Sequence, residues 1–191
     1  MESLEILIKF INILAKLRDP YENGHGSRVK DISLKIARKF GYSEEELEQL
    51  SAIATLHDIG KMLLEDRVIN KLGRLTATQR KSINDHAFFG AKILRELGID
   101  YAICNAVEQH HERWDGSGYP KGLRGVYILQ TARIIGVADS YDAMVSSRPY
   151  RVAKSKDTAM KEIKLLSGII YDPDVVEKFI EIMNTEETNA G

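Results

Sequence analysis

Five histidines are the residues of this chain best suited to chemistry, and they are spread along it: His25, His57, His86, His110 and His111. Asp58 directly follows the second of them, and Asp139 lies 28 residues beyond the last. If His57–Asp58 and His110–His111 each count as one position, intervals of 24 to 32 residues separate successive positions of this set. Each interval is about one helix and its connection, so neighbouring helices of a bundle could each deliver one or two side chains to a shared centre. Five imidazoles and two carboxylates are too many ligands for one ion. They suit two first-row divalent ions bridged by a carboxylate.

A purely structural interpretation competes with the metal site. A lone histidine on an apolar helical face is more often a hydrogen-bonded core residue than a ligand, because a buried titratable ring needs partners. Three of the histidines, His57, His86 and His110, fall on such faces, and all five fall at element-spaced positions. The spacing alone leaves both interpretations open.

The elements that would position these side chains are predicted to be helices. Apolar residues recur with helical spacing over residues 4–14, 29–40, 47–57, 86–97, 103–110, 128–139 and 176–183. Over residues 86–97, the face that packs on the core is predicted to be His86, Phe89, Ile93 and Leu97. Residues 114–126 form the one loop-like stretch, and no alternating segment of strand length is found. The predicted fold class is all-α.

Polar residues mark the expected helix starts, at Ser43, Thr76, Ser155 and Asp172. The first two are followed three residues later by Glu46 and Gln79, which predicts two capping boxes. Asp172 precedes Pro173, a residue that is favoured at the first position of a helix. These signals agree with the helical periodicity.

Composition excludes several classes of protein. The 191 residues are 43% hydrophobic, with 27 Lys and Arg, 28 Asp and Glu, and a net charge of −1. This balance argues against a protein that coats a DNA or RNA polymer and against electrostatic binding to a membrane. No apolar run approaches the roughly 18 residues of a membrane span. The single cysteine, Cys104, excludes a disulfide framework and fits a reducing compartment, so a cytoplasmic location is expected.

An ordered series of motifs makes the metal interpretation specific. The matching stretches are Gly24–Val29 (GHGSRV), Leu56–Lys61 (LHDIGK), Asp85–His86, His110–Pro120 (HHERWDGSGYP), Val137–Ala143 (VADSYDA) and Arg148–Arg151 (RPYR). Over about residues 19–173 the chain resembles the HD-GYP subfamily of the HD metal-dependent phosphohydrolase superfamily. The resemblance implies an HD-domain helical bundle with additional C-terminal helices and a glycine-rich GYP loop. We expect an N-terminal helix at 1–18 that could end a linker, a catalytic domain at 19–184 and a disordered tail at 185–191.

The resemblance also implies two divalent transition-metal ions. One would be held by His25, His57, Asp58 and Asp139, and Asp58 would bridge to a second held by His86, His110 and His111. Some family members hold a third ion with a glutamate four residues before the first motif histidine, but that position is Tyr21 here, so two ions are expected. Imidazole-rich ligation without sulfur favours iron or manganese, with zinc, cobalt or nickel as alternatives.

The activity implied by the resemblance is hydrolysis of cyclic di-GMP (c-di-GMP) to linear pGpG, to GMP or to both, through a metal-bridging hydroxide. Lys61 would contact the phosphate. Asp142 lies one helical turn beyond Asp139 and could orient the nucleophile or protonate the leaving oxygen, in contact with the substrate. Arg148 and Arg151 match family positions that contact the phosphate or the ligand.

The glycine-rich loop that contains Gly118, Tyr119 and Pro120 has two interpretations. It could bind the substrate, with Tyr119 stacked on a base, because glycines let the backbone approach a ligand closely. It could instead be a structural turn between two ligand-bearing helices. In the family this loop is also linked to contacts with diguanylate cyclase (GGDEF) proteins, and the domain usually follows a sensory domain.

Other functional classes stay open. A different HD-superfamily hydrolase would act on nucleoside monophosphates or on guanosine tetraphosphate (ppGpp), but the GYP stretch and residues 148–151 argue against it. A non-catalytic module that senses c-di-GMP or binds proteins is disfavoured by ligands at all seven metal positions. One branch of the fold uses di-iron with oxygen, and oxygen-dependent turnover of a polyol would reveal that chemistry.

Overall fold

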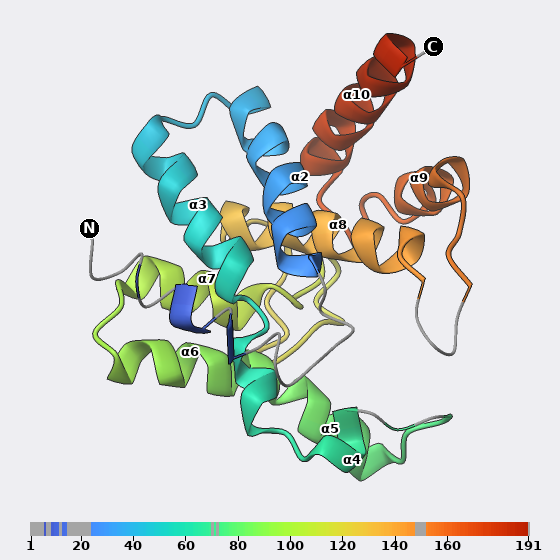
Figure 1. The fold of residues 1–191 in the computed structure, drawn as a ribbon. Helices are drawn as coiled ribbons and strands as arrows, with labels where there is room; N and C mark the ends of the chain where they lie inside the picture. Colours follow the sequence, from blue (N-terminus) through green and yellow to red (C-terminus); the bar gives the residue numbers. More distant parts are fainter. Residues whose placement is uncertain are drawn as a thin grey trace.

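The computed structural model describes residues 6, 9–11, 13–14, 24–69, 71, 73–147 and 152–190, and these form helices joined by loops (Figure 1). The helices are α2 (His25–Lys39), α3 (Glu44–Leu56), η2 (Ile59–Leu63), α4 (Asp66–Ile69), α5 (Ala77–Asn84), α6 (His86–Glu96), α7 (Tyr101–Gln109), η3 (Gly125–Tyr127), α8 (Gln130–Val145), α9 (Lys156–Leu165) and α10 (Pro173–Ala190). In these described ranges the one β-type pairing is an isolated bridge between Ser167 and Tyr171. The predicted all-α fold is confirmed.

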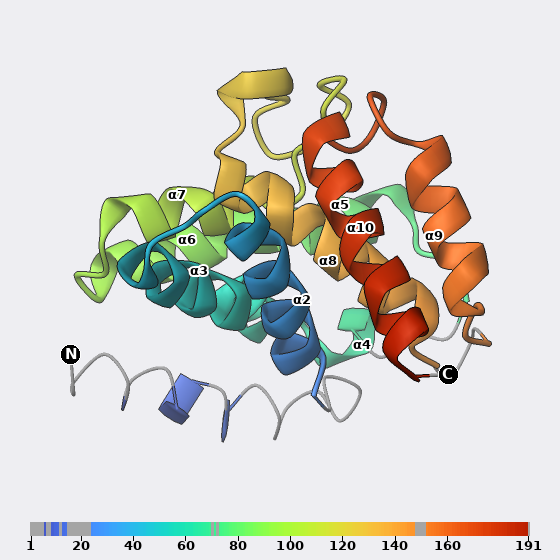
Figure 2. The same cartoon turned by 90° about the horizontal axis from the view of Figure 1, so that it is seen from above.

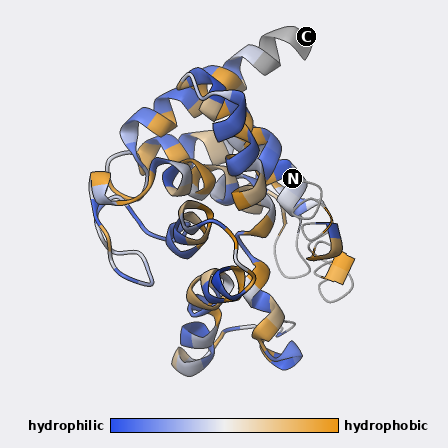
Figure 3. Cartoon of the chain, turned by 90° about the vertical axis from the view of Figure 1, so that its left-hand side faces the viewer, coloured by the Kyte–Doolittle hydropathy of each residue, from blue (hydrophilic) through white to orange (hydrophobic). Residues whose placement is uncertain are grey.

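Two helix pairs and one crossing helix make up the body of the protein. α2 packs beside α3, α6 packs beside α7, and α8 contacts both α2 and α7 (Figures 1 and 2). α9 and α10 cover α8 on the opposite side from α7, while α4 and α5 project below α6. Each helix alternates apolar and polar segments (Figure 3). The largest fully buried apolar side chains are those of Phe179, Ile36, Leu50, Leu56, Leu94, Ile128, Ile134, Ile135 and Ile163.

The predicted helix starts are observed as hydrogen-bonded caps. Ser43 and Thr76 each accept a bond from the backbone N–H three residues later, and both capping boxes are complete. Ser155 caps α9 through the N–H of Thr158, and Asp172 accepts from the N–H of Asp174 at the start of α10. Side-chain acceptors of this kind satisfy the first N–H groups of a helix, which have no partner within it.

The sequence predicted a helix at the N-terminal end of the chain and a tail at its C-terminal end, and the structure describes part of each. Residues 185–190 belong to α10, where the sequence predicted a disordered tail, and the predicted domain bounds stay predictions. Of the predicted first helix, residues 6, 9–11 and 13–14 are described, all of them helical, and Ile11 is buried in the core cluster. None of the helices in the described ranges is both long and apolar enough to cross a lipid bilayer.

The end of α7 holds the glycine-rich loop by three side-chain acceptors. Glu112 accepts from the backbone N–H groups of Lys121 and Leu123 at 2.7 and 2.9 Å. Gln109 accepts from the N–H of Leu129 at 2.8 Å, and the buried Glu108 pairs with Lys121. Because these acceptors flank His110 and His111 in the sequence, their hydrogen bonds fix the position of the loop relative to the two histidines.

Candidate metal centre

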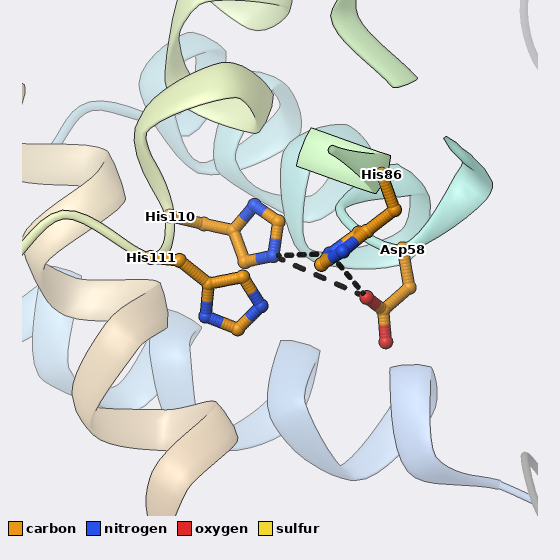
Figure 4. Close-up of side chains that lie close together, drawn as sticks. All are labelled: Asp58, His86, His110 and His111. Atoms are coloured by element: carbon orange, nitrogen blue, oxygen red, sulfur yellow. Dashed lines mark hydrogen bonds and ion pairs between the residues drawn. The ribbon is translucent and has the colours of Figure 1, made fainter. Parts of the chain in front are cut away.

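The carboxylate of Asp58 lies at the centre of the histidine cluster, and Figure 4 shows one of its oxygens paired with His86 and His110. Oδ1 lies 3.1 Å from Nε2 of His86 and 4.0 Å from Nε2 of His110. Oδ2 lies 3.4 Å from Nε2 of His57 and 4.0 Å from Nε2 of His25. One carboxylate therefore joins two groups of nitrogen donors, as a bridging ligand does.

Two sets of donor atoms, each within 4.8 Å of one another, share this carboxylate. The first contains Asp58, His86, His110 and His111, and the second contains His25, His57 and Asp58. The sequence predicted these same residues as ligands. Asp139 lies at the edge of the second set, with Oδ1 3.3 Å from Nε2 of His25.

Six of the seven predicted ligands lie at or directly beside a helix end, and Asp139 lies within α8 (Gln130–Val145). His25 opens α2, His86 opens α6, and His57 with Asp58 follows the last residue of α3. His110 and His111 follow α7 directly. The sequence placed His57 inside a helix, but His57 is the C-cap residue that directly follows α3.

A close contact between two glycines brings Asp58 and His86 together. A Cβ atom on Gly60 would lie 1.9 Å from the carbonyl oxygen of His86 and 2.6 Å from the N of Gly90. Backbone cannot yield to such an overlap, so only glycine fits here. This approach sets the position of α6 against the segment that carries Asp58.

The second ring nitrogens of three histidines fix their tautomers. Nδ1 of His57, His86 and His110 lies 2.8, 2.5 and 2.6 Å from the carbonyl oxygen three residues earlier in the chain. A carbonyl can only accept, so each Nδ1 carries the proton and donates it. In the neutral ring, Nε2 then keeps its lone pair and directs it into the cluster.

This arrangement fits metal ions better than it fits a hydrogen-bonded core. Nε2 of His86 and Nε2 of His110 lie 3.3 Å apart, so in the neutral rings two lone pairs face one another. The buried Nε2 of His57 and Oδ1 of Asp58 make no hydrogen bond within the described parts of the chain. Converging acceptor atoms without donors are what a cation satisfies, so the His/Asp cluster could hold metal.

Electrostatics keeps His110, His111 and Asp58 in their metal-binding form. At His57, burial lowers the pKa but the neighbouring Asp58 outweighs it, so that pKa is raised. Burial and the neighbouring His111 hold the pKa of His110 well below its usual value, and burial lowers the pKa of His111 to about 3. Burial alone would raise the pKa of Asp58, but Lys61 and His57 outweigh it and hold that pKa well below its usual range. These two imidazoles are therefore neutral and the carboxylate is ionised at neutral pH.

His25 differs because it lies between two carboxylates. Nδ1 is 2.7 Å from Oδ2 of Asp142, and Nε2 faces Asp139. Burial lowers the pKa of His25, but hydrogen bonds to Asp139 and Asp142 outweigh burial and raise it to about 10.

Asp142 lies behind His25, and all of its described bonds are to protein groups. Besides His25, it accepts from Nε and Nη2 of Arg28 at 2.5 and 3.0 Å and from the hydroxyl of Ser146 at 3.3 Å. Its side chain is 2% exposed. The sequence predicted that Asp142 would meet the substrate or the reacting oxygen. The geometry instead supports a positioning role, because both carboxylate oxygens are already in use.

We expect Asp142→Asn to weaken metal binding. An amide accepts at only one atom, so it cannot hold both His25 and Arg28, and loss of such an outer partner typically costs 10- to 100-fold in metal affinity. Competition with a chromophoric chelator would measure the change. Asp31→Asn, on the exposed side of α2, is the matched control. Equal metal affinity of Asp142→Asn and the parent would contradict the positioning role.

The remaining predicted site residues have different placements. Lys61 lies at the centre, with Nζ 2.5 Å from Oδ2 of Asp58. Tyr119 packs on His111 with ring centres 4.8 Å apart, and Pro120 is exposed. A Cβ on Gly118 would lie 2.4 Å from the N of Arg113, so this glycine serves chain packing and needs no ligand to explain it. Arg148 and Arg151 lie outside the described residues.

Three residues that support the site escaped the sequence prediction: Arg28, Gly60 and Glu112. Each lies inside a motif stretch, within three residues of a predicted ligand, and that proximity was the available indication. Their roles depend on partners elsewhere in the fold, such as the contact of Arg28 with Asp142, 114 residues away.

Comparisons with known proteins agree with this geometry. A family model described as "HD domain" matches residues 9–175. A cyclic di-GMP phosphodiesterase of Thermotoga maritima is 40% identical over 183 residues, which are 92% of this chain and 48% of the relative. The cyclic di-GMP phosphodiesterase response regulator RpfG of Xanthomonas campestris pv. campestris is 35% identical over 85% of this chain and 44% of its own length. The chain thus spans about half the length of these relatives.

A solved structure shares the fold. The crystal structure of a cyclic GMP-AMP-specific phosphodiesterase of Vibrio cholerae superposes with a TM-score of 0.70 and 23% sequence identity, over 93% of this chain and 49% of that one. The family model and the first two relatives cover most of the chain, and the motif series predicted from the sequence is thereby confirmed. Its histidines and Asp58 form a His/Asp cluster that could hold metal, and the chain belongs to the HD domain family.

Proposed function

We propose that this chain is a metal-dependent phosphodiesterase that hydrolyses cyclic di-GMP to linear pGpG, to GMP or to both. The observation that carries the proposal is the carboxylate of Asp58, whose two oxygens face two separate groups of histidines. Relatives named as cyclic di-GMP phosphodiesterases support the substrate. A structural cluster of histidines would not need a shared carboxylate at its centre.

The chain's residues would divide the work as follows. His25, His57 and Asp139 would hold one divalent ion, and His86, His110 and His111 the other, with Asp58 shared. Iron or manganese fits this donor set best, and zinc, cobalt or nickel would also fit. When bound, such ions supply Lewis-acid activation of the phosphodiester and of the attacking water.

Lys61 would stabilise charge on the phosphate. Its ammonium lies at the same carboxylate and its side chain is 33% exposed, so it can turn toward a ligand above the centre. A positive charge at that position stabilises the transition state more than the bound substrate, because negative charge grows on the phosphoryl oxygens in the transition state. Hydrolysis would break one P–O bond of the cyclic diester and leave one phosphate monoester and one hydroxyl.

The experiment that tests the proposal measures metal and activity together. We expect about two transition-metal ions per chain by elemental analysis, and hydrolysis of c-di-GMP that chelation abolishes and added manganese or iron restores. Separation of the products by chromatography would distinguish pGpG from GMP. A protein that takes up no manganese or iron, or that is loaded with two ions and leaves c-di-GMP intact, would contradict the proposal.

Three further expectations rest on the family resemblance, on exposed side chains and on composition. We propose that the glycine-rich loop can meet diguanylate cyclase (GGDEF) proteins, which is supported by the exposed apolar side chains of Val126 and Tyr127 just beyond it, 75% and 80% accessible. An upstream sensory domain and a cytoplasmic location stay predictions.

A further inference from the structure

A cavity of about 100 Å³ lies directly beside the metal centre. It is bounded by His110 and His111 at the end of α7, by Gly136 and Ser140 of α8, and by Tyr171 before α10. Trp114 and Tyr171 give it aromatic sides, and Arg113 lies at its edge. No role described so far uses this space.

His111 presents a hydrogen-bond donor for which the described part of the chain shows no acceptor. One of its ring nitrogens points toward Asp58 and His110, and the other points away from them (Figure 4). Metal-binding histidines almost always donate the second N–H to a carbonyl, a carboxylate or a water, as His57, His86 and His110 do here. No hydrogen bond from the His111 ring to a described residue is observed, and because His111 lines the cavity, a ligand in that space can accept from it.

Arg113 adds an uncommitted positive charge at the same place. Its exposed guanidinium has no ion pair or side-chain hydrogen bond to any described residue, whereas Arg133, which also lines the cavity, pairs with Asp172. The carboxylate of Glu112 is taken by two backbone N–H groups. The acidic side chains at the cavity, Glu112 and Asp172, are therefore already paired, whereas the guanidinium of Arg113 is not.

We propose that this cavity is a subsite for a guanine base of the substrate, with Arg113 as a residue that determines base specificity. The inference rests on the proposed function. Guanine presents two acceptors, O6 and N7, along one edge, and a bidentate arginine is the commonest specific partner of that edge. Adenine has an amino donor in place of O6, which would face the donors of Arg113 and His111. The aromatic sides suit the faces of a purine.

The test compares Arg113→Gln with the parent as metal-loaded proteins. Substrates are c-di-GMP, cyclic di-AMP and bis(p-nitrophenyl) phosphate, which has no base. We expect kcat/KM for c-di-GMP to fall roughly 10- to 100-fold, mainly through KM. Activity on the other two substrates and metal content should change less than about twofold. Arg124→Gln, an exposed arginine of the same loop that does not line the cavity, is the control.

Binding of GMP and AMP, measured by calorimetry on the same proteins, judges the base preference without turnover. The parent should bind GMP more tightly than AMP, and Arg113→Gln should bind both alike. A parent without preference, an equal loss on all three substrates, or an unchanged KM for c-di-GMP would overturn the inference and assign the cavity to ordered water. A parent that prefers GMP and hydrolyses no cyclic dinucleotide would overturn the proposed function alone.

Discussion

Replacing Asp58 with alanine is expected to abolish hydrolysis of c-di-GMP and to lower metal content at both ion positions. Each carboxylate oxygen faces its own group of histidines, so one substitution removes a ligand from both. A pair of ions activates water by lowering its pKa by several units, and loss of that effect should exceed roughly 1000-fold in rate. Elemental analysis and a c-di-GMP assay on the same sample measure the two consequences.

Two comparisons separate the shared carboxylate from a general loss of structure. His86→Ala removes a ligand from one group only, so it should deplete mainly one ion. Asp157→Ala removes an exposed carboxylate in the first turn of α9 and should leave metal content and turnover at the parental level. Circular dichroism should show the same helix content in all variants. Near-normal turnover of Asp58→Ala would mean that Asp58 does not bridge.

The candidate ligand positions could be predicted from the sequence because each one lies in a short motif, at a helix end or, for Asp139, within α8. A helix is positioned by its apolar face, so a ligand beside that face is carried to the centre whenever the helix packs. His110 and the apolar residues Ile103 and Val107 share one face of α7 and its last turn, and all three are buried. The spacing between motifs then sets which helix supplies which ligand.

The inner face of α6 shows where periodicity fails. The sequence predicted that Phe89, Ile93 and Leu97 face the core with His86. Ile93 does pack against the core cluster, but Phe89 is only half-buried outside it and Leu97 is exposed, so for these two the prediction was wrong. Leu97 is 49% exposed, and the three line an apolar surface hollow together with Leu63. The buried face is instead His86, Ala87, Gly90, Ala91 and Leu94.

Close approach of two backbone segments explains why the buried face of α6 differs from the predicted one. The contact between Gly60 and Gly90 leaves room only for small side chains on the side of α6 that meets η2. Hydrophobic periodicity gives weight to large apolar residues and little to glycine and alanine, so it selects the wrong face of such a helix. A face of small residues next to a predicted ligand is the pattern that would have identified the contact.

The partners of the ligands could not be predicted for a different reason. Asp142 lies one turn beyond Asp139 on α8, which suggested a shared role at the reacting atoms. Its observed partners are His25 and Arg28, which α2 brings to it from more than 110 residues away. Helical spacing determines which residues share a face, but only the packing of α2 on α8 determines what that face meets.

Replacing Lys61 with alanine is expected to lower turnover of c-di-GMP roughly 100- to 1000-fold while the metal ions stay bound, because removal of one preorganised donor to a developing charge typically costs that much. An ammonium has no lone pair at neutral pH and cannot be a ligand. Its removal also takes a positive charge away from Asp58, which favours rather than weakens binding of a cation. Single-turnover kinetics and elemental analysis on one preparation measure both effects.

Two substitutions make the Lys61 result specific. Lys81 also pairs with an aspartate, Asp85 at 3.0 Å, but at the surface, so Lys81→Ala should keep the parental rate. Lys61→Arg should recover only part of the activity, because a planar guanidinium does not replace a compact charge. A parental rate for Lys61→Ala with full metal occupancy would show that Lys61 merely neutralises Asp58. Loss of metal together with activity would instead place Lys61 in the support of the bridging carboxylate, since only then would the ion pair be needed to hold Asp58 in place.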